Sequence, residues 1–478
     1  MMHDLSTRRR FLKQLTGWAA AAVGAPGLRV AGAEREAPQG SGRQRPNVIL
    51  TMTDDQGWGD TGYNGHPVLK TPALDAMART GLRFNRFHSG APVCSPTRGS
   101  AMTGRHPYRY GIFFANVGHM RPKEVTLAEA LKTQGYATGH FGKWHLGTLT
   151  KTEKDSNRGG PGGVTHYSPP WDNGFDVCFS TEAKVPTWDP MHQPGTNKPY
   201  GTHYWTGPGQ KVTENLAGDD SRVIMDRAIP FIRDAVAKQQ PFLAVIWFHT
   251  PHEPVLAGPA YLKRYPNARS EKHRHYYGCL TAMDEQMGRL RAELRSLGVA
   301  ENTMLWFCAD NGPEHRGGPG STGGLRGRKR DLFEGGIRVP GLLEWPARIT
   351  KPRTTNVPCS TCDYFPTVLA ALGFHMKGQP EPIDGVDLMP LVDGSMTERP
   401  RPIAFESKNQ IALVDNQWKL ITTNKGKTWM LYDLVADPAE ANDLAAQQPD
   451  VVAQMKQTLE AWRQSCQASL AGKDYRGT

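Results

Sequence analysis

The stretch NVILTMT at residues 47–53, followed directly by the acidic pair Asp54 and Asp55, decides how the chain folds. A largely apolar run of this length is typical of a buried β-strand that other elements cover on both faces. Three further runs have the same character, and each also ends in polar residues. These are residues 137–141 before Lys143 and His145, residues 242–248 before His249 and His252, and residues 304–308 before Asp310 and Asn311.

Helical signals lie between these runs. Thr126 and Glu129 have the spacing of a capping box, which opens a helix. Apolar residues recur at helical spacing from Leu280 to Leu294, and Gly298 follows as a stop signal. Strands that alternate with helices favour an open α/β sheet, and such sheets bind ligands beyond the carboxyl ends of their strands. We therefore expect the polar residues after the four runs to converge on one site.

The composition excludes several classes of protein. The chain has 478 residues, of which 38% are hydrophobic, so it can bury a sizeable core and is not intrinsically disordered. No uninterrupted apolar run reaches the roughly 18 residues of a membrane-spanning helix, which excludes a polytopic membrane protein. The formal net charge of +11 favours anionic partners. Because the sequence has no nucleic-acid-binding motif, we expect an anionic small or polymeric substrate and no nucleic acid.

The first 33 residues predict an export signal. Residues 7–13 read TRRRFLK, which resembles a twin-arginine signal, and a modest apolar stretch follows. The small residues Ala31, Gly32 and Ala33 then provide a cleavage site. The alternative is an ordinary amphipathic helix. We expect export to the periplasm or the outside of the cell, with a flexible linker over residues 34–45.

We expect the rest of the chain to form a catalytic domain over residues 46–375 and an α+β subdomain over residues 376–478. The composition changes after Gly373, and the tail combines short strand-like runs with a helix. The apolar face of that helix contains Val452, Met455, Leu459 and Trp462. Residues 151–215, which are rich in Gly, Pro, Trp and His, predict long loops over the site.

The seven cysteines are an odd number, so at least one has no partner within the chain. In an exported protein the others can pair as disulfides. Cys359 and Cys362 have CxxC spacing, but no second pair or nearby histidines accompany them, so we expect a structural role. His273 and His275 also lack further ligands at metal spacing, and they predict the polar start of a helix.

Residues 94–105, CSPTRGSAMTGR, carry the strongest chemical signal. Pro96 suits the first turn of a helix, which places Cys94 at the helix N-terminus. Free N–H groups and the helix dipole favour an anion there. Arg98 lies one turn further on and can hold a tetrahedral oxyanion through two hydrogen bonds. A lone cysteine is more often a core residue, so this interpretation needs support from the rest of the chain.

This stretch resembles the signature of the formylglycine-dependent sulfatases, the type I sulfatases of the alkaline phosphatase superfamily. The segments GKWHLG at residues 142–147, HTPHEP at residues 249–254 and DNG at residues 310–312 resemble further motifs of that family in the same order. The resemblance runs from Asn47 to the C-terminal helix. It implies a large mixed, mostly parallel sheet flanked by helices, with a smaller C-terminal α+β subdomain. It also implies that a maturation enzyme oxidises Cys94 to formylglycine.

The resemblance implies a site for one divalent cation. Its ligands would be the oxygen atoms of Asp54, Asp55, Asp310 and Asn311, together with the modified side chain at Cys94. Hard oxygen ligands favour calcium or magnesium over zinc, and calcium is the family expectation.

The same resemblance implies which residues bind sulfate. Arg98, Lys143 and Lys329 would hold its oxygens, and His145 would hydrogen-bond to the hydrated aldehyde and accept its proton. Lys329 lies upstream of the EGG motif at residues 334–336. The arginines beside it, which predict a solvated basic loop, are Arg326, Arg328 and Arg330.

The proton donor to the leaving alcohol is expected to be His252 or Lys329. Two histidines follow the run at residues 242–248, and we prefer His252 to His249 as the residue that contacts sulfate. Pro251 and Pro254 flank His252 and are expected to hold its backbone in an extended conformation.

The expected activity is hydrolysis of sulfate monoesters. The basic balance and the export signal favour a sulfated carbohydrate as the partner. Aromatic residues in the loop-rich stretch either pack the loops or stack on a sugar ring, and these are Trp171, Trp188, Tyr204 and Trp205. One alternative is a phosphoester or phosphonate hydrolase of the same superfamily. A second is a non-catalytic carbohydrate-binding relative, which would have no need of an intact CSPTR motif and metal ligands.

Overall fold

The computed structural model describes residues 45–314 and 318–475. The chain divides into two units, Met1–Arg43 and Gln44–Thr478, and the description below concerns the second. The predicted signal peptide, and all but the last residue of the predicted linker, lie outside the described residues. Within those residues, none of the helices combines the length and the apolar character that crossing a membrane requires.

The main sheet has ten strands in the order β12-β2-β11-β9-β1-β8-β4-β5-β6-β7. Its centre is five parallel strands: β9 (Thr303–Ala309), β1 (Asn47–Thr53), β8 (Phe242–Trp247), β4 (Ala137–Lys143) and β5 (Val177–Thr181). Thr53 pairs with Ala309 and Met52 with Trp247, so these strands end at one edge. The outer strands are β2 (Leu82–Phe84), β11 (Gly341–Glu344), β12 (Arg353–Thr355), β6 (Trp205–Gly207) and β7 (Gln210–Lys211). The mixed, mostly parallel sheet is confirmed.

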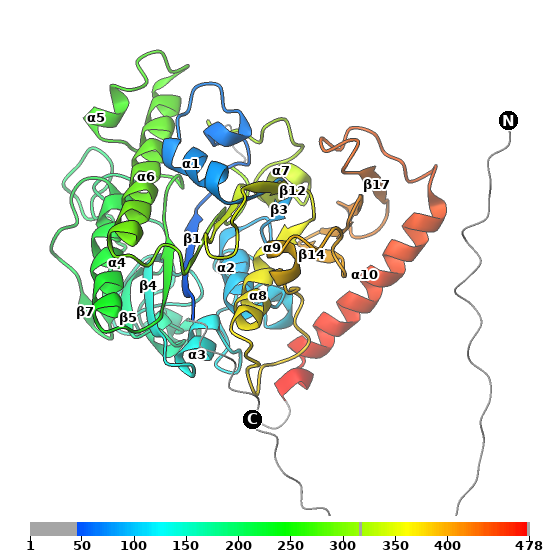
Figure 1. Ribbon diagram of the computed structural model, residues 1–478, viewed down its shortest axis with the longest axis horizontal. Coiled ribbons are helices and arrows are strands. Elements are labelled where there is room, and N and C mark those ends of the chain that lie inside the picture. The colour runs from blue at the N-terminus through cyan, green and yellow to red at the C-terminus, as the bar shows by residue number, and fades with distance from the viewer. Residues whose placement is uncertain (1–44, 315–317, 476–478) are drawn as a thin grey trace, which may run out of the picture. The chain divides into compact units, whose positions relative to one another are not determined.

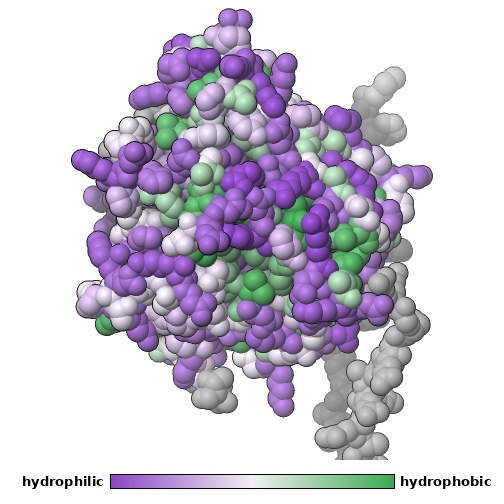
Figure 2. All heavy atoms as spheres, turned by 90° about the vertical axis from the view of Figure 1, so that its left-hand side faces the viewer, coloured by the Kyte–Doolittle hydropathy of each residue, from purple (hydrophilic) through white to green (hydrophobic). Residues whose placement is uncertain are grey.

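Strand β1 contributes to a separate core on each face of the sheet. Val48, Leu50 and Met52 pack into one core and Ile49 into the other, which explains the nearly continuous apolar run. The helices α1 (Pro72–Thr80), α4 (Asp220–Ala237) and α6 (Glu271–Ser296) cover the Ile49 face. The opposite face carries α2 (Cys94–Thr103), α3 (Leu127–Lys132), α8 (Tyr364–Ala371) and α9 (Met389–Val392) (Figure 1). Hydrophilic side chains cover most of the outer surface on the α4 and α6 side (Figure 2).

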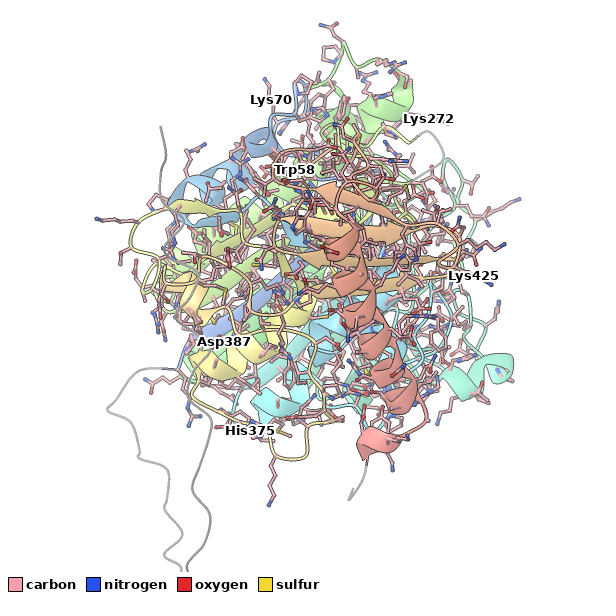
Figure 3. All side chains as sticks on the ribbon, turned by 90° about the vertical axis from the view of Figure 1, so that its right-hand side faces the viewer. Trp58, Lys70, Lys272, His375, Asp387 and Lys425 are labelled. Carbon is pink, nitrogen blue, oxygen red and sulfur yellow. The ribbon has the colours of Figure 1, made fainter. Side chains whose placement is uncertain are left out.

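A smaller antiparallel sheet follows in the C-terminal part of the chain. Its strands are β14 (Ile403–Ser407), β15 (Gln410–Asp415), β16 (Trp418–Thr422) and β17 (Met430–Asp433). Helix α10 (Pro449–Leu470) crosses one face (Figure 3) and buries Met455 and Leu459 against it. The other face packs on Leu332 and Ile337. Residues 386–392 contribute side chains to the core of the main sheet, and the division at residue 375 stays a prediction.

The remaining elements are short. A three-stranded sheet joins β10 (Arg338–Val339), β3 (Phe87–His88) and β13 (Cys359–Ser360). Two single-turn helices are α5 (Pro259–Leu262) and α7 (Glu334–Ile337). The 3₁₀ turns are η1 (Gly62–Asn64), η2 (Pro107–Arg109), η3 (Pro161–His166), η4 (Pro170–Asp172), η5 (Thr361–Asp363) and η6 (Lys473–Tyr475).

Local sequence signals predicted most elements but missed one central strand. Thr126 and Glu129 make both bonds of the predicted capping box at the start of α3. The sequence predicts loops over residues 151–215, yet this stretch also supplies β5 and the short edge strands β6 and β7. Tyr204 and Trp205 are completely buried, so they pack the loops and cannot stack on a sugar. All seven cysteines lie in the described residues, where they are buried free thiols.

Candidate active site

A pocket of about 420 Å³ opens where β1, β4, β8 and β9 end at the same edge of the main sheet. Its lining includes Cys94, Lys143, His145, His252 and Lys329, which come from four separate parts of the chain. Because parallel strands in register end together, the segments that follow them meet at this edge. The structure thus brings the polar residues after the four predicted strands into one site.

Cys94 is the first residue of α2, and Val93 precedes it as the N-cap residue. Pro96 lies in the first turn, where the N–H that proline lacks would have no helical partner. The helix ends at Gly104, whose φ of 69° favours glycine. Burial outweighs the nearby charge of Lys143 and raises the pKa of the Cys94 thiol, so the unmodified side chain is neutral.

Arg98 joins two carboxylates behind the pocket. Its Nη2 lies 2.7 Å from Asp310 Oδ2 and 3.3 Å from Asp54 Oδ2, and its Nη1 donates to the Lys143 carbonyl at 3.0 Å. The Lys143 ammonium donates to Asp54 Oδ2. Arg98 is completely buried and is not part of the pocket lining, whereas Lys143 is. Arg98 therefore contacts both carboxylates, and Lys143 also faces the pocket. The expected contact of Arg98 with sulfate stays a prediction.

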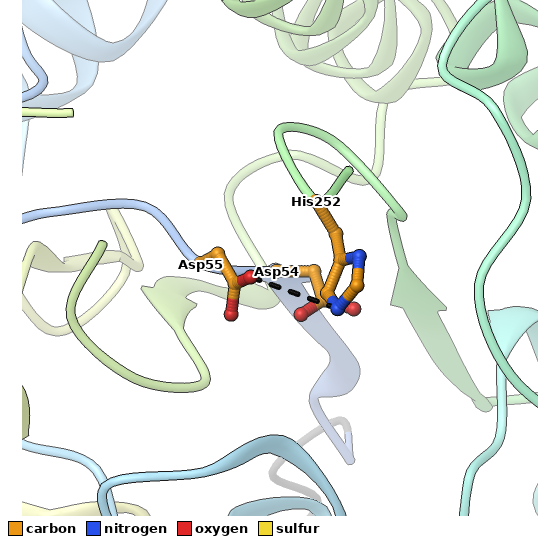
Figure 4. Close-up of side chains that lie close together, drawn as sticks. All are labelled: Asp54, Asp55 and His252. Atoms are coloured by element: carbon orange, nitrogen blue, oxygen red, sulfur yellow. Dashed lines mark ion pairs between the residues drawn. The ribbon is translucent and has the colours of Figure 1, made fainter. Parts of the chain in front are cut away.

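Asp55 connects three further residues of the site. Lys329 Nζ donates to its Oδ2 at 2.6 Å, and Asn311 Nδ2 donates to its Oδ1 at 2.7 Å. His252 Nε2 lies 3.6 Å from Asp55 Oδ2, and Figure 4 shows the imidazole approaching the two acidic side chains from the loop after β8. Asp55 has a φ of 65°. A left-handed conformation is uncommon for Asp and concentrates at functional sites, where surrounding contacts hold it.

Burial and neighbouring charges shift the pKa values of Asp54 and Asp310, the two carboxylates that Arg98 joins, in opposite directions. Burial, reinforced by the charge of Asp54, raises the pKa of Asp310 to about 7 despite Arg98. Burial acts in the same direction on Asp54, but the neighbouring cationic groups, led by Lys143, hold the pKa of Asp54 well below its usual value. A further positive charge between the two side chains would stabilise the ionised form of both.

The donor set fits a hard cation. One ligand atom each from Asp54, Cys94 and Asp310 lies within 4.8 Å of the others. Asp54 Oδ1 and Asn311 Oδ1 are buried, and neither accepts a hydrogen bond from the described residues. Leaving such oxygens without a partner is costly, and a bound cation would satisfy both. Carboxylate and amide oxygens are the ligands that calcium and magnesium prefer.

The two histidines after β8 have different surroundings. His249 is completely buried, with its Nδ1 2.8 Å from Asp220 Oδ2 and its Nε2 2.7 Å from Thr181 Oγ1. The His252 side chain is 14% exposed and lines the pocket. The extended backbone expected at His252 stays a prediction, while its N–H donates to the His249 carbonyl at 2.7 Å and closes a turn. That turn directs the His252 side chain back toward the ends of the strands.

His145 is held by a residue that the motifs did not reveal. Its Nε2 lies 2.9 Å from Asn116 Oδ1, which also accepts a hydrogen bond from Asn157 Nδ2 at 3.1 Å. An amide oxygen can only accept, so His145 Nε2 carries the proton and Nδ1 is left as an acceptor. Nδ1 is buried and has no partner among the described residues. Burial and then the charge of Lys143 lower the pKa of His145, which favours this neutral form.

The arginines around Lys329 are only partly solvated, because each also has partners within the protein. Arg328 donates to the carbonyls of Glu314 and Gly320, at 3.0 and 2.7 Å. Arg330 pairs with the Glu314 carboxylate. Arg326 is exposed, yet it donates to Tyr432 Oη at 3.0 Å. These bonds tie the segment that carries Lys329 to its neighbours. Because the partners lie far away in the sequence, no local sequence pattern could have predicted the bonds.

Comparison with known proteins shows the family. The sulfatase family model matches residues 46–374, and the model of the C-terminal region of N-sulphoglucosamine sulphohydrolase matches residues 327–465. The N-acetylgalactosamine-6-sulfatase of Canis lupus familiaris is 33% identical over 409 residues, which cover 80% of this chain and 72% of that protein. Arylsulfatase G of Rattus norvegicus is 33% identical over 391 residues, covering 73% and 69%.

Solved structures share the fold. Ps i-CgsB in complex with k-i-k-neocarrahexaose has a TM-score of 0.76 and 26% identity, over 88% of this chain and 93% of that one. PsFucS1 sulfatase from Pseudoalteromonas sp. has a TM-score of 0.73 and 23% identity, covering 91% and 92%. The phosphonate monoester hydrolase of Agrobacterium radiobacter has a TM-score of 0.65 and 19% identity, covering 88% and 96%.

The fold and the matches define a hydrolase of the alkaline-phosphatase-like class. The chain belongs to the sulfatase family and is a sulfuric ester hydrolase. The expected fold class and family are both confirmed. Family members use a metal ion and formylglycine, and the acidic cluster around Asp54 is the candidate place for that metal.

Proposed function

We propose that this sulfatase is exported, carries formylglycine at position 94 with one calcium ion, and removes sulfate from a carbohydrate ester. The observation that carries the proposal is the meeting of Cys94 with Asp54 and Asp310 beside a pocket that Lys143 and Lys329 line. The twin-arginine-like segment supports export. The hexaose bound to Ps i-CgsB and the amino-sugar sulfatases among the relatives support a carbohydrate substrate.

Five positions would hold the cation: Asp54, Asp55, Asp310, Asn311 and residue 94. Hydrated formylglycine would supply an oxygen nucleophile, and calcium would supply positive charge that stabilises developing negative charge. The buried acceptors Asp54 Oδ1 and Asn311 Oδ1 support this ligand set. Asp310 is the carboxylate suited to take a proton from the nucleophile, because a ligand atom of Asp310 lies within 4.8 Å of one of Cys94.

The cationic side chains of the site have different roles in sulfate binding. Lys143 and Lys329 line the pocket and present ammonium groups to the sulfate oxygens. Burial disfavours the charged amine of Lys329, but Asp55 and the other acidic groups outweigh it and raise its pKa. Lys329 therefore keeps its proton and acts as a fixed positive charge. Arg98 fixes the orientation of Asp54 and Asp310 from behind.

His252 is the residue placed to protonate the leaving alcohol. Its Nδ1–H donates to the Glu253 carbonyl at 2.7 Å, so Nε2 is the atom that gains and loses a proton. Burial lowers the pKa of His252 to about 4 in the pocket without substrate. The negative charge of bound sulfate acts in the opposite direction and favours the protonated ring. The Nε2 proton then lies on the pocket side of the imidazole.

His145 is placed to take a proton from the group at position 94. Both residues line the same pocket, and the acceptor Nδ1 of His145 has no partner among the described residues. Asn116 fixes the tautomer that leaves Nδ1 free of a proton. Release of sulfate needs a base of this kind, because a second hydroxyl must lose its proton as the aldehyde reforms.

Mass spectrometry of the peptide that spans residue 94 tests the nucleophile. Active protein should carry an aldehyde there in place of the thiol. Cys94→Ala should lose turnover and keep its fold, whereas Cys178→Ala, at another buried cysteine outside the pocket, should stay active. A fully active preparation that contains only the thiol at residue 94 would exclude the proposal.

A phosphoester or phosphonate hydrolase is the second candidate, because a phosphonate monoester hydrolase has the same fold. Sulfuryl and phosphoryl groups are both tetrahedral oxyanions, so the fold alone does not separate them. Steady-state kcat/KM for a sulfate and a phosphate monoester of the same alcohol does. We expect the sulfate ester to be the better substrate, and the reverse order would favour the alternative.

A further inference from the structure

A second pocket adjoins the catalytic one. It has a volume of about 580 Å³ and shares Asn116 and Asn157 with the catalytic pocket, so the two pockets adjoin at these residues. Its other polar lining residues are Lys154, Arg158 and His166. Both pockets fall within the roughly 300–1,000 Å³ that is usual for small-molecule sites. A ligand longer than one sugar unit could therefore occupy both.

The wall of the second pocket is held in a defined shape. Arg158 Nε lies 3.1 Å from the buried carboxylate of Glu182, and its Nη1 donates to the Gly118 carbonyl at 2.6 Å. The Gly160 N–H donates to the Thr150 carbonyl at 3.1 Å. A Cβ at Gly163 would lie 1.5 Å from the Arg158 carbonyl oxygen, so only glycine allows this close approach. These contacts form the pocket before any ligand binds.

The chemistry of the second pocket suits an anion with hydroxyl groups. None of the described residues that line it is acidic. Lys154 is exposed and has no ion-pair partner in the described ranges, so its charge is available to a ligand. Asn116 Oδ1 is occupied by His145 and Asn157, which leaves its Nδ2 as a donor at the junction of the two pockets. Amide and imidazole groups complete a lining that can hydrogen-bond to a sugar.

We propose that this second pocket binds an anionic sugar unit next to the one whose sulfate ester is cleaved. The unit carries a carboxylate or a second sulfate, and Lys154 is the charge that recognises it. The inference rests on the proposed carbohydrate sulfatase function and adds a substrate class, an oligosaccharide with anions on neighbouring units. The pocket at Trp188 is a weaker candidate, because it shares no lining residue with the catalytic pocket.

The test compares Lys154→Glu with the wild-type protein on four substrates. Three are sulfated oligosaccharides whose neighbouring unit carries a carboxylate, a second sulfate or no charge, and the fourth is nitrophenyl sulfate. We expect KM for the substrates with an anionic neighbouring unit to rise roughly tenfold. The substitution removes one attractive charge contact with that unit and adds one repulsive contact. The neutral-neighbour and nitrophenyl substrates should keep their kinetics. Whichever of the two anionic substrates shows the larger rise in KM identifies the recognised group as a carboxylate or a sulfate.

Lys272→Glu is the matched control, because it makes the same charge change at an exposed position at the start of α6 (Figure 3). An equal loss in both variants would mean that only the overall charge matters and would overturn the subsite. Unchanged kinetics of Lys154→Glu on every oligosaccharide would also overturn it and leave the proposed function intact. A wild-type protein that cleaves nitrophenyl sulfate but none of the oligosaccharides would overturn both.

Discussion

His249 and His252 lie three residues apart, yet only His252 can reach a substrate. Burial and two polar contacts hold His249 in the core, with Asp220 and Thr181 as its partners. The turn after β8 instead presents His252 to the pocket beside Asp55. A general acid must lie within hydrogen-bond reach of the leaving oxygen, and of the two imidazoles only that of His252 lines the pocket where this oxygen would lie.

His252→Ala should lower kcat/KM on a carbohydrate sulfate by about 100- to 10,000-fold, the usual effect of losing a general acid. The loss should be smaller on nitrophenyl sulfate, whose leaving group needs little protonation. His249→Ala should instead lower the free energy of unfolding by about 2–4 kcal/mol, because Asp220 and Thr181 lose a buried partner. Kinetics on both esters and denaturant unfolding of both variants check this. A leaving-group-dependent loss in His249→Ala would reverse the assignment.

We expect Asn116 to act on catalysis through His145, with which it shares a hydrogen bond. Asn116→Ala removes the acceptor that fixes the His145 tautomer and should lower kcat roughly tenfold, in the range found for groups that orient a functional histidine. KM for nitrophenyl sulfate should change little, since this small ester does not extend into the second pocket. Asn116→Asp keeps an oxygen acceptor, tolerates the φ of 62° and should restore most of the rate. Equal losses in both variants would contradict this role.

At the scale of elements, the small C-terminal sheet braces the segment that carries Lys329. Gln410 begins β15, and its Oε1 accepts the Leu332 N–H at 2.9 Å while its Nε2 donates to the Arg330 carbonyl at 2.7 Å. The Gln410 side chain thus satisfies two backbone groups of this segment, the Leu332 N–H and the Arg330 carbonyl. The sheet reaches the active site through these two bonds.

Gln410→Met should lower kcat/KM about tenfold, because a side chain of similar size then leaves the Leu332 N–H and the Arg330 carbonyl without their partner. The displacement of Lys329 should appear mainly as a higher KM for sulfate esters. Gln417→Met is the control, since the side chain of the exposed Gln417 bonds only to Asp433 among the described residues. Unchanged kinetics in Gln410→Met would show that the segment holds its shape without the sheet.

The ends of β1 and β9 form the proposed metal site together with the start of α2. Exhaustive chelation should abolish activity and lower the melting temperature, and added calcium should restore both. A cation at about 100 times its Kd contributes about 2.7 kcal/mol to stability. Asp310→Asn removes one ligand charge, and its melting temperature should respond much less to chelation. Full activity after complete removal of divalent cations would exclude the metal from catalysis.

At the scale of the whole molecule, a buried ion cluster links the C-terminal sheet to the main domain. Lys419 in β16 lies 2.9 Å from both Glu334 and Glu440, and His88 in β3 lies 3.2 Å from Glu334. Lys419 and both glutamates are completely buried. Such a cluster costs desolvation when it forms and a great deal more when one member is lost.

Lys419→Met should lower the free energy of unfolding by about 3–5 kcal/mol, because it leaves two buried carboxylates without their cation. Lys427→Met, at an exposed position in the turn after β16, should change it little. Urea unfolding followed by fluorescence measures both. A stability of Lys419→Met equal to that of Lys427→Met would show that the cluster does not couple the two parts of the chain.

The sequence by itself determined the elements whose signals are local. Largely apolar runs marked β1, β8 and β9, because a strand buried on both faces needs apolar residues on both. The run at residues 137–141 marked β4, although it includes Thr138 and His140. Thr126 and Glu129 marked the start of α3, and Pro96 placed Cys94 at the start of α2. In each case the residues that make the feature are neighbours in the chain, so their spacing is enough to predict it.

Only the tertiary structure decided which distant residues meet. Asp55 and Lys329 are 274 residues apart, and Asn116 and His145 are 29 residues apart, yet each pair shares a hydrogen bond. β5 was missed because its place in the sheet comes from pairing with β4 rather than from its own composition. Two further features depend on turns and loops that pack against other segments. These are the placement of His252 rather than His249 in the pocket, and the presence of the second pocket. Long-range packing sets these contacts, and local sequence patterns carry no record of it.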